Sequence, residues 1–324
     1  MISKLYDVLV IGGGPAGLSA AVGLARQAHT ALILDSGVYR NARSTHMHTV
    51  PGFDHRDPAE FRAKVRADLE ARYGCVEYKG GVTVSQVRRL EGGNVDDVRR
   101  FEAVDEDGTV WKGRRLVLAT GVKDLIDDEV EGFAECWGRG VFHCLFCHGY
   151  EERGAESVGV LATDTFSTPE MLTHVARMAK RLSRHVNIYT GGRPSLASLA
   201  SHVRSSGISI DDRPVTSLAL VDGGPRVRIA FGDGSEARTE GFVVSHPAAE
   251  QSAPFAAQLG LNMGVAGEIK AGAPWNETSV EGCYAAGDSA TQMRSALQAV
   301  HMGGMAGTGV VMGLQKEMEA TDEL

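Results

Sequence analysis

One segment near the N-terminus constrains the fold more than any other, because an apolar run, a glycine cluster and an alanine-rich stretch follow one another directly. Val8 to Ile11 predicts a buried strand, Gly12 to Gly17 a tight turn, and Leu18 to Gln27 a helix. A second apolar strand, Ala31 to Leu34, ends at Asp35, about 20 residues beyond the glycines, as in a dinucleotide-binding βαβ unit. The segment therefore predicts a parallel α/β fold that binds a nucleotide.

The residues of this turn have distinct physical tasks. Gly12, Gly14 and Gly17 permit the turn, the close approach of the backbone to a pyrophosphate and tight packing of the helix on the sheet. The helix N-terminus faces the phosphate charge. Asp35 can accept hydrogen bonds from the adenosine ribose hydroxyls. The expected phosphate loop is Gly12, Gly13, Gly14, Pro15, Ala16 and Gly17.

The same order of parts recurs in the middle of the chain. Val158 to Leu161 corresponds to the first strand, Pro169 to Arg184 to the first helix, and Val186 to Tyr189 to the strand that ends at Asp35. Each copy is followed by an expected hairpin, one turning at Asp107-Gly108 and one at Asp233-Gly234 between the strands 227–230 and 241–244.

The C-terminal region completes the first copy. A short strand ending in Gly287-Asp288 delivers an acid that can hold a ribityl hydroxyl of a flavin, and a helix is expected from Arg294 to Gln315. The predicted architecture is α/β, with two Rossmann-like three-layer ββα domains. Residues 1–120 and 243–324 form a discontinuous nucleotide-binding domain, and residues 121–242 form a second domain inserted in it.

The second copy has lost the features that bind a phosphate. Where the first copy has its glycines, the second has Ala162 to Ser167, which contains no glycine and places Asp164 where a pyrophosphate would lie. Arg193 is the only arginine in the loop after the next strand. A single arginine offers little positive charge for binding the 2'-phosphate of a nicotinamide cofactor. We expect the fold to be retained here and dinucleotide binding to be lost.

Cys144 and Cys147 form a C-x-x-C pair, which can pass two electrons as disulfide and dithiol. Half a zinc site is the alternative, but there is no second C-x-x-C, and His143 and His148 would crowd four ligands into six consecutive residues. We expect no metal. Because the thiolate is the reactive form of cysteine, His148 is the first candidate for the acid–base group and His143 the second.

Composition limits the partners. The chain has 33 basic and 41 acidic residues and a net charge of −8, which argues against nucleic acid or an anionic membrane as the main partner. No apolar run approaches the roughly 18 residues of a membrane span, and no signal peptide is visible, so we expect a cytoplasmic enzyme. The remaining cysteines, Cys75, Cys136 and Cys283, are expected to be buried, inert thiols.

The order of motifs resembles a known family. A G-G-G-P-A-G loop, A-T-G, C-x-x-C and A-A-G-D follow one another as in the low-molecular-weight thioredoxin reductases. Within that family, the segments Asp35–Ala42, His46–His48 and Cys144–Glu151 are similar to the FAD-dependent dithiol oxidases that close the disulfide of gliotoxin- and holomycin-type natural products. This branch implies non-covalent FAD, a homodimer, O2 as the terminal acceptor with H2O2 as product, and loss of NADPH use.

The resemblance also implies roles for individual residues. Cys147 would face the flavin, and Cys144 would form the mixed disulfide with substrate. The related reductases carry an acid where this chain has His148, so the resemblance does not carry an acid–base role to that residue. Besides the phosphate loop, the implied FAD-binding residues are Asp35, Ser36, Gly37, Arg40, Asn41, His48, Ala119, Thr120, Gly121, Gly287, Asp288, Arg294, Ser295 and Ala296.

The sequence thus favours an FAD-dependent oxidase that closes a disulfide in a small-molecule dithiol. The first alternative is an NADPH-dependent reductase of thioredoxin or a related protein, which would need Arg193 to bind the nucleotide. A second alternative is a flavin-bound redox sensor that uses its cysteine pair as a switch.

Overall fold

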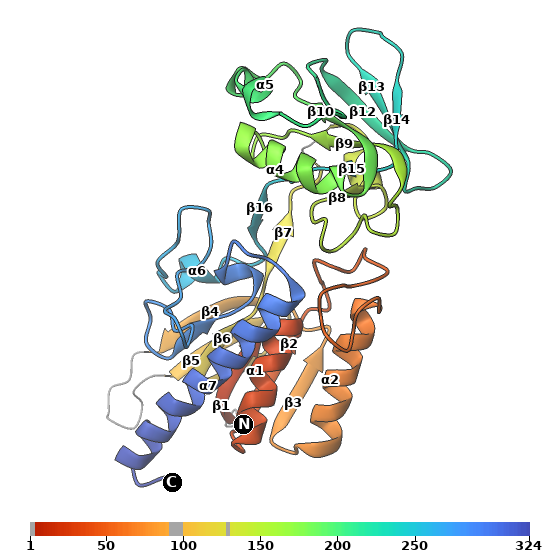
Figure 1. Ribbon diagram of the computed structural model, residues 1–324. Coiled ribbons are helices and arrows are strands. Elements are labelled where there is room, and N and C mark those ends of the chain that lie inside the picture. The colour runs from red at the N-terminus through yellow and green to blue at the C-terminus, as the bar shows by residue number, and fades with distance from the viewer. Residues whose placement is uncertain (1–3, 91–99, 128–129) are drawn as a thin grey trace. The chain divides into compact units, whose positions relative to one another are not determined.

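A computed structural model describes residues 4–90, 100–127 and 130–324. The chain divides into two compact units (Figure 1). The outer unit comprises residues 1–123 and 250–324, and the inserted unit comprises residues 124–249. The chain passes between the units along two short strands, β7 (Val122–Asp124) and β16 (Ala249–Gln251), which pair with each other.

The outer unit is built on a seven-stranded sheet in the order β3-β2-β1-β6-β5-β4, with β17 also paired to β6. Strands β3, β2, β1, β6 and β17 run parallel, and β4 and β5 are antiparallel additions at one edge. The expected hairpin at Asp107-Gly108 is confirmed between β5 and β6. The elements are β1 (Leu5–Ile11), α1 (Pro15–Arg26), β2 (Ala31–Asp35), α2 (Pro58–Arg72), β3 (Val76–Gly80), β4 (Val84–Leu90), β5 (Arg100–Asp105), β6 (Val110–Leu118), α6 (Phe255–Gln258), β17 (Cys283–Ala285), the 3-10 turn Asp288–Ala290 and α7 (Ala296–Ala320).

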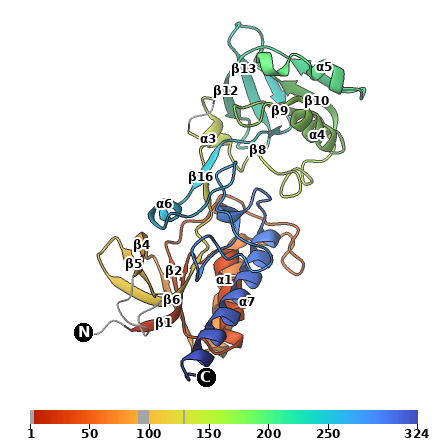
Figure 2. The ribbon, with the colours of Figure 1, turned by 90° about the vertical axis from the view of Figure 1, so that its left-hand side faces the viewer.

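Strand β1 divides the core of this unit into two layers, because successive side chains of a strand point to opposite faces. Val8 and Val10 pack in the cluster under α1 and α7, whereas Leu9 and Ile11 pack in the cluster on the other face. Helices α1 and α7 lie side by side in both views (Figures 1 and 2). Within the described ranges, no helix combines the length and the apolar character needed to span a bilayer.

The inserted unit repeats the parallel arrangement on a smaller scale. A five-stranded parallel sheet has the order β11-β10-β9-β15-β8, and a three-stranded antiparallel sheet has the order β12-β13-β14. The predicted pair of nucleotide-binding-type α/β domains is therefore confirmed. The elements are α3 (Phe133–Cys136), β8 (Val141–Phe142), β9 (Ala155–Leu161), α4 (Pro169–Lys180), β10 (Ser183–Tyr189), the 3-10 turn Pro194–Leu196, α5 (Leu199–His202), β11 (Ile208–Asp211), β12 (Val215–Leu220), β13 (Val227–Phe231), β14 (Arg238–Glu240) and β15 (Val243–Val244).

Two sequence expectations differ from the structure around residue 243. The hairpin turning at Asp233-Gly234 pairs β13 with β14 at 238–240, so the predicted pairing with residues 241–244 was wrong. Val243 and Val244 instead pair with β9 and β8 in the parallel sheet, where they are fully buried. A fully buried apolar run is typical of a strand covered on both faces. The second crossing between the units accordingly lies at 249–250 and not at 242–243.

Helix α4 is the third difference from the sequence expectation. It ends at Lys180 and not at Arg184, because β10 already begins at Ser183.

Candidate active site

The loop before α1 forms an open cradle. Gly12 adopts φ +108°, and a Cβ there would lie 2.4 Å from the carbonyl oxygen of Ala119. A Cβ on Gly17 would lie 1.9 Å from the carbonyl oxygen of Gly12, so only glycine permits this packing of α1 on β1. Gly14 has no atom within 4 Å of its Cβ position, and among the described residues no side chain caps the helix. The backbone N–H groups of this helix N-terminus, which no described side chain caps, suit a pyrophosphate.

Asp35 lies at the end of β2 as expected, but its carboxylate is already engaged. It is 2% exposed and accepts hydrogen bonds from the hydroxyls of Tyr39 and Tyr78, the latter at 2.6 Å, and from the backbone N–H of Gly37 at 3.3 Å. Burial and the neighbouring Asp35 carboxylate raise the pKa of both tyrosines. A ribose hydroxyl would have to replace one of these phenols. The sequence did not predict this pair of tyrosines.

Residues around the same loop come from distant parts of the chain. Arg40 donates to the Asp288 carboxylate at 3.0 Å across 248 residues of sequence. Gly287 adopts φ +80°, and a Cβ there would lie 2.9 Å from the Cβ of Ala16. The structure therefore brings the glycine loop, the Arg40 segment and the Asp288 turn together.

The other implied FAD-binding residues lie on neighbouring segments of the outer unit. The side chain of Arg62 donates to Asn41 at 3.1 Å, and the Ser295 hydroxyl caps α7 by accepting from the N–H of Gln298 at 3.1 Å. Ala119 follows β6 and donates its N–H to Ile11 at 2.9 Å. Ser36 and Gly37 follow β2, His48 lies in the loop that follows Asn41, Thr120 and Gly121 follow Ala119, and Arg294 and Ala296 adjoin the start of α7.

The residues present fit the diphosphate half of FAD, because an open glycine cradle and an uncapped helix N-terminus stand together. Asp35 would join them only after its hydrogen bonds to the tyrosines rearrange.

Cys144 and Cys147 form a disulfide in the inserted unit, with a Cα–Cα distance of 5.2 Å. The backbone N–H groups of Cys147 and His148 both bond to the carbonyl oxygen of Cys144, at 3.1 and 3.0 Å, which closes a tight turn. The sulfurs belong to partly exposed residues, and Phe146 between them is 72% exposed. The turn that carries the disulfide is therefore partly open to solvent.

The two histidines predicted for proton transfer lie in aromatic surroundings. The ring of His148 stacks on Phe142 with centroids 4.8 Å apart and planes within 5°. The ring of His143 stacks on Trp137 at 5.3 Å and meets the edge of His246 at 5.9 Å. The stacking restrains the orientation of each imidazole close to the disulfide.

His246 is a candidate that the sequence analysis missed. Strands β15 and β8 run parallel, with Val243 opposite Val141 and Val244 opposite Phe142. The backbone N–H of Ser245 bonds to the Phe142 carbonyl at 3.0 Å, so the chain after each strand continues in step and His246 emerges beside the start of the disulfide turn. Carboxyl ends of parallel strands are where such folds build their sites. Only the pairing of β15 with β8 indicates that His246 lies near the disulfide turn, and this pairing is not visible in the sequence.

Glu152 is a second residue that the sequence did not single out. Burial raises the pKa of its carboxylate, whose Oε2 is buried.

The corresponding loop of the inserted unit, residues 162–167, contains no glycine and is closed by its own side chains. The Thr163 hydroxyl donates to the His246 carbonyl at 2.6 Å and accepts from the N–H of Phe166 at 3.2 Å. Asp164 forms an ion pair with Arg193. The Thr168 hydroxyl accepts from the N–H of Met171 at 3.3 Å and so caps α4. The features that α1 leaves open for a phosphate are satisfied internally at α4.

Comparison with known proteins identifies the family to which the chain belongs. Residues 6–161 match the family model described as pyridine nucleotide-disulphide oxidoreductase. The chain is 40% identical to thioredoxin reductase aclD of Aspergillus oryzae, over 99% of this chain and 100% of that protein. It is 39% identical to thioredoxin reductase sirT of Leptosphaeria maculans, over 95% and 94%. The crystal structure of HlmI superimposes with a TM-score of 0.85 at 27% identity, covering 98% of this chain and 95% of that one.

Proposed function

The chain belongs to the thioredoxin reductase family of flavin-dependent oxidoreductases, and on that premise we propose that it is an oxidase of small-molecule dithiols. The substrate class is a dithiol of the epidithiodiketopiperazine type, in which the enzyme closes an intramolecular disulfide. The family implies FAD, and O2 is the terminal acceptor, giving H2O2. The names of the relatives specify no dithiol, so the substrate class rests on the resemblance of the segments Asp35–Ala42, His46–His48 and Cys144–Glu151.

The observation that carries the choice of oxidase over reductase is the closed loop of the inserted unit. Asp164 holds Arg193 in an ion pair, which neutralises the only arginine of the loop that follows β10. Thr168 satisfies the N-terminus of α4 that a pyrophosphate would need. A nucleotide phosphate would have to displace both contacts and approach a carboxylate, so NADPH binding is disfavoured.

The residues of the turn carry out the thiol chemistry. A substrate thiolate attacks the Cys144 sulfur, the Cys144–Cys147 bond breaks, and Cys147 leaves as a thiolate. The second substrate thiol, as thiolate, then attacks the substrate sulfur that is bonded to Cys144 and releases Cys144 as a thiolate. This leaves a substrate disulfide and an enzyme dithiol. A bound FAD would supply the two-electron acceptor that returns this dithiol to the disulfide, with O2 as the proposed final oxidant.

Protons must leave the substrate thiols before attack. His148 is the first candidate to accept them, because it directly follows Cys147 and its ring is held against Phe142. His143, with His246 at its edge, is the second.

The deciding experiment mixes the purified yellow protein, without O2, first with NADPH and then with a diketopiperazine dithiol. We expect NADPH to leave the flavin absorbance oxidised, the dithiol to bleach it, and readmitted O2 to restore it with one H2O2 per dithiol. Cys147→Ser should abolish bleaching, whereas Arg193→Ala should leave dithiol turnover unchanged. A flavin that stays oxidised with the dithiol, or a Cys147→Ser enzyme with full turnover, would refute the proposal.

An NADPH-dependent thioredoxin reductase is the second candidate, favoured by the names of the relatives. It requires the Asp164–Arg193 pair to open for the nucleotide. Rapid bleaching of the flavin by NADPH, lost in Arg193→Ala, would support this candidate instead. Either enzyme is proposed to be a homodimer, which light scattering coupled to size exclusion tests directly.

A further inference from the structure

One stretch of the inserted unit, residues 171–210, contains no acidic residue. It holds six of the chain's 33 lysines and arginines, so the rest of the chain keeps 27 basic and all 41 acidic residues, a net charge of −14. The stretch folds into α4, β10, α5 and most of β11, and α4, β10 and α5 lie together in Figures 1 and 2. An acidic protein thus concentrates positive charge in one region of its fold.

Helix α4 presents two of these cations on one side. Arg177 and Arg181 are exposed and four residues apart, so they are neighbours on the helix surface. Lys180 lies in the last turn and bonds to the carbonyl oxygen of Ser183 at 3.4 Å. Positive charge is favourable at a helix C-terminus, but like charges at this spacing repel each other.

The chain that follows α5 runs along the same helix. Nε2 of His202 lies 3.2 Å from the carboxylate of Glu170 in the first turn of α4. A Cβ on Gly207 would lie 2.9 Å from Cε of Lys180 in the last turn. The exposed Arg204 lies between these two points of the chain, so it adds its charge to those of α4.

Strand β10 supplies a further cation at its start. The side chain of Arg184 is 75% exposed, and its carbonyl oxygen lies 3.1 Å from the Cβ position of Gly207. Glu156 of β9 pairs with Arg184 at 3.5 Å, and an exposed pair of this kind is weak. Among the described residues, Glu156 is the one carboxylate paired with this group of cations. We call the following residues the basic face: Arg177, Lys180, Arg181, Arg184 and Arg204.

The basic face adjoins the disulfide turn, residues 144–148, through Leu182. A Cβ on Gly149 would lie 3.3 Å from Cδ1 of Leu182, and the N–H of Gly154 bonds to the Leu182 carbonyl at 2.7 Å. Leu182 directly follows Arg181 in the chain. The segment after the disulfide therefore borders the basic face within the inserted unit.

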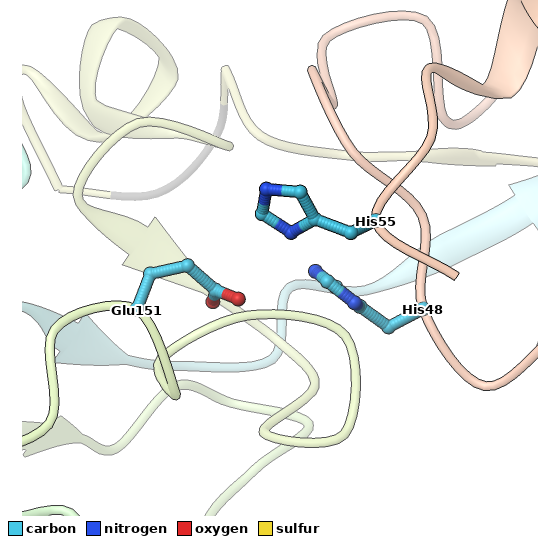
Figure 3. A group of neighbouring side chains, drawn as sticks. All are labelled: His48, His55 and Glu151. Carbon is cyan, nitrogen blue, oxygen red and sulfur yellow. The ribbon is translucent and has the colours of Figure 1, made fainter.

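This border carries side chains that are common in protein interfaces. Tyr150 is 62% exposed, and the guanidinium of Arg153 lies 4.3 Å from the centroid of its ring. Glu151 extends from the same loop in Figure 3. Interfaces between proteins are enriched in tyrosine and arginine and have a polar rim, so this composition suits the edge of a docking surface.

We propose that the basic face docks an acidic protein beside the disulfide turn. Four of its five residues are arginines, whose guanidinium groups bind carboxylates through paired hydrogen bonds. A long polyanion such as a nucleic acid would also meet the acidic remainder of the chain, whereas a protein can present its carboxylates to this face alone. The proposal goes beyond the dithiol oxidase function and does not depend on it.

Fluorescein-labelled poly-L-glutamate is the probe, and its fluorescence anisotropy with the oxidised, FAD-loaded protein reports binding in the absence of any dithiol. We expect saturable binding that weakens as salt is added, because salt screens exposed charges. The combined variant Arg177→Glu, Arg181→Glu and Arg204→Glu should bind the probe at least about tenfold more weakly.

The matched control combines Arg26→Glu, Arg72→Glu and Arg89→Glu, which alters three exposed arginines of the outer unit and changes the net charge equally. It should lose at most about twofold in affinity near physiological salt, because distant charges are screened. Equal losses in the two variants would refute the assignment, as would a parent protein that does not bind the probe. A labelled DNA duplex that binds the parent more tightly than polyglutamate would overturn the choice of a protein partner.

Two measurements on the parent protein complete the test. Should the combined variant fold poorly by circular dichroism, carbodiimide cross-linking of polyglutamate to lysines, mapped by mass spectrometry, decides the case. A cross-link at Lys180 supports the basic face, and cross-links at other lysines alone refute it. Light scattering at low and high salt tests for a second copy of this chain at this face. Self-association that is lost both in high salt and in the combined variant would overturn the proposal.

Discussion

The crossing of α1 and α7 permits a sharp test with two adjacent glycines. At Gly303 a Cβ would lie 2.1 Å from the carbonyl oxygen of Ala16 and 2.8–2.9 Å from its backbone carbons. At Gly304, the next residue of the same helix, a Cβ would meet nothing within 4 Å. Both alanine substitutions therefore raise the helix propensity equally, but only Gly303→Ala creates a steric clash.

The expected free energies follow from these contacts. Restoring an ordinary contact of about 3.4 Å at Gly303→Ala requires the helices to separate by about 1.3 Å, and the atoms in the way are backbone. Overpacking of this kind costs about 1–3 kcal/mol, and the gain in helix propensity of about 1 kcal/mol offsets part of it. We expect Gly303→Ala to lose up to about 2 kcal/mol of unfolding free energy and Gly304→Ala to gain up to about 1 kcal/mol.

Urea unfolding of both variants after removal of FAD measures this difference, because bound FAD would add a stabilisation that depends on its affinity for each variant. The stoichiometry of bound flavin is the second readout, since Ala16 belongs to the phosphate loop and a displaced α1 should bind FAD more weakly in Gly303→Ala only. Equal unfolding midpoints, or a less stable Gly304→Ala, would refute the claim that backbone contact sets the identity of residue 303.

Two further predictions concern titration and thiol reactivity. Arg213 donates two hydrogen bonds to the Asp211 carboxylate, at 2.6 and 2.9 Å, and holds the pKa of Asp211 below its ordinary value. The stabilisation from the ionised Asp211 carboxylate is therefore present above about pH 4 and is lost as the pH falls below it. The Tm of Asp211→Asn should be lower than that of the parent protein near neutral pH, and the difference should shrink towards pH 3. A difference in Tm that stays constant with pH would contradict this. Burial raises the pKa of Cys136 to about 11 and that of Cys283 to about 12. Neither thiol should therefore react with iodoacetamide at pH 8 until the protein unfolds, because the thiolate is the reactive form. Mass spectrometry of the labelled native protein checks this.

Much of the outer unit could be predicted from local patterns. The strand, glycine turn and helix from Val8 to Gln27 are specified by neighbouring residues, and the structure places β1 and α1 there. The hairpin after β13 was predicted with the wrong partner because turn residues locate a turn but do not select the second strand. Val243 and Val244 join the parallel sheet through burial, which is a tertiary property.

The functional residues divide in the same way. The Cys144–Cys147 pair was visible because its chemistry depends on spacing along the chain. His246 was missed because its position beside the disulfide turn depends on the register of β15 with β8. The tyrosines around Asp35 were missed because Tyr78 reaches it from a neighbouring strand, 43 residues away.

The closed loop at α4 also bears on how such a protein could change its electron donor over evolutionary time. Removing the Asp164 carboxylate alone would leave Arg193 without its partner while Thr168 still caps the helix. Replacing Thr168 alone would expose the helix end next to an anion. Each single substitution removes one of these two contacts and leaves the other in place. Opening this loop to a pyridine nucleotide would thus require at least two substitutions, one at Asp164 and one at Thr168.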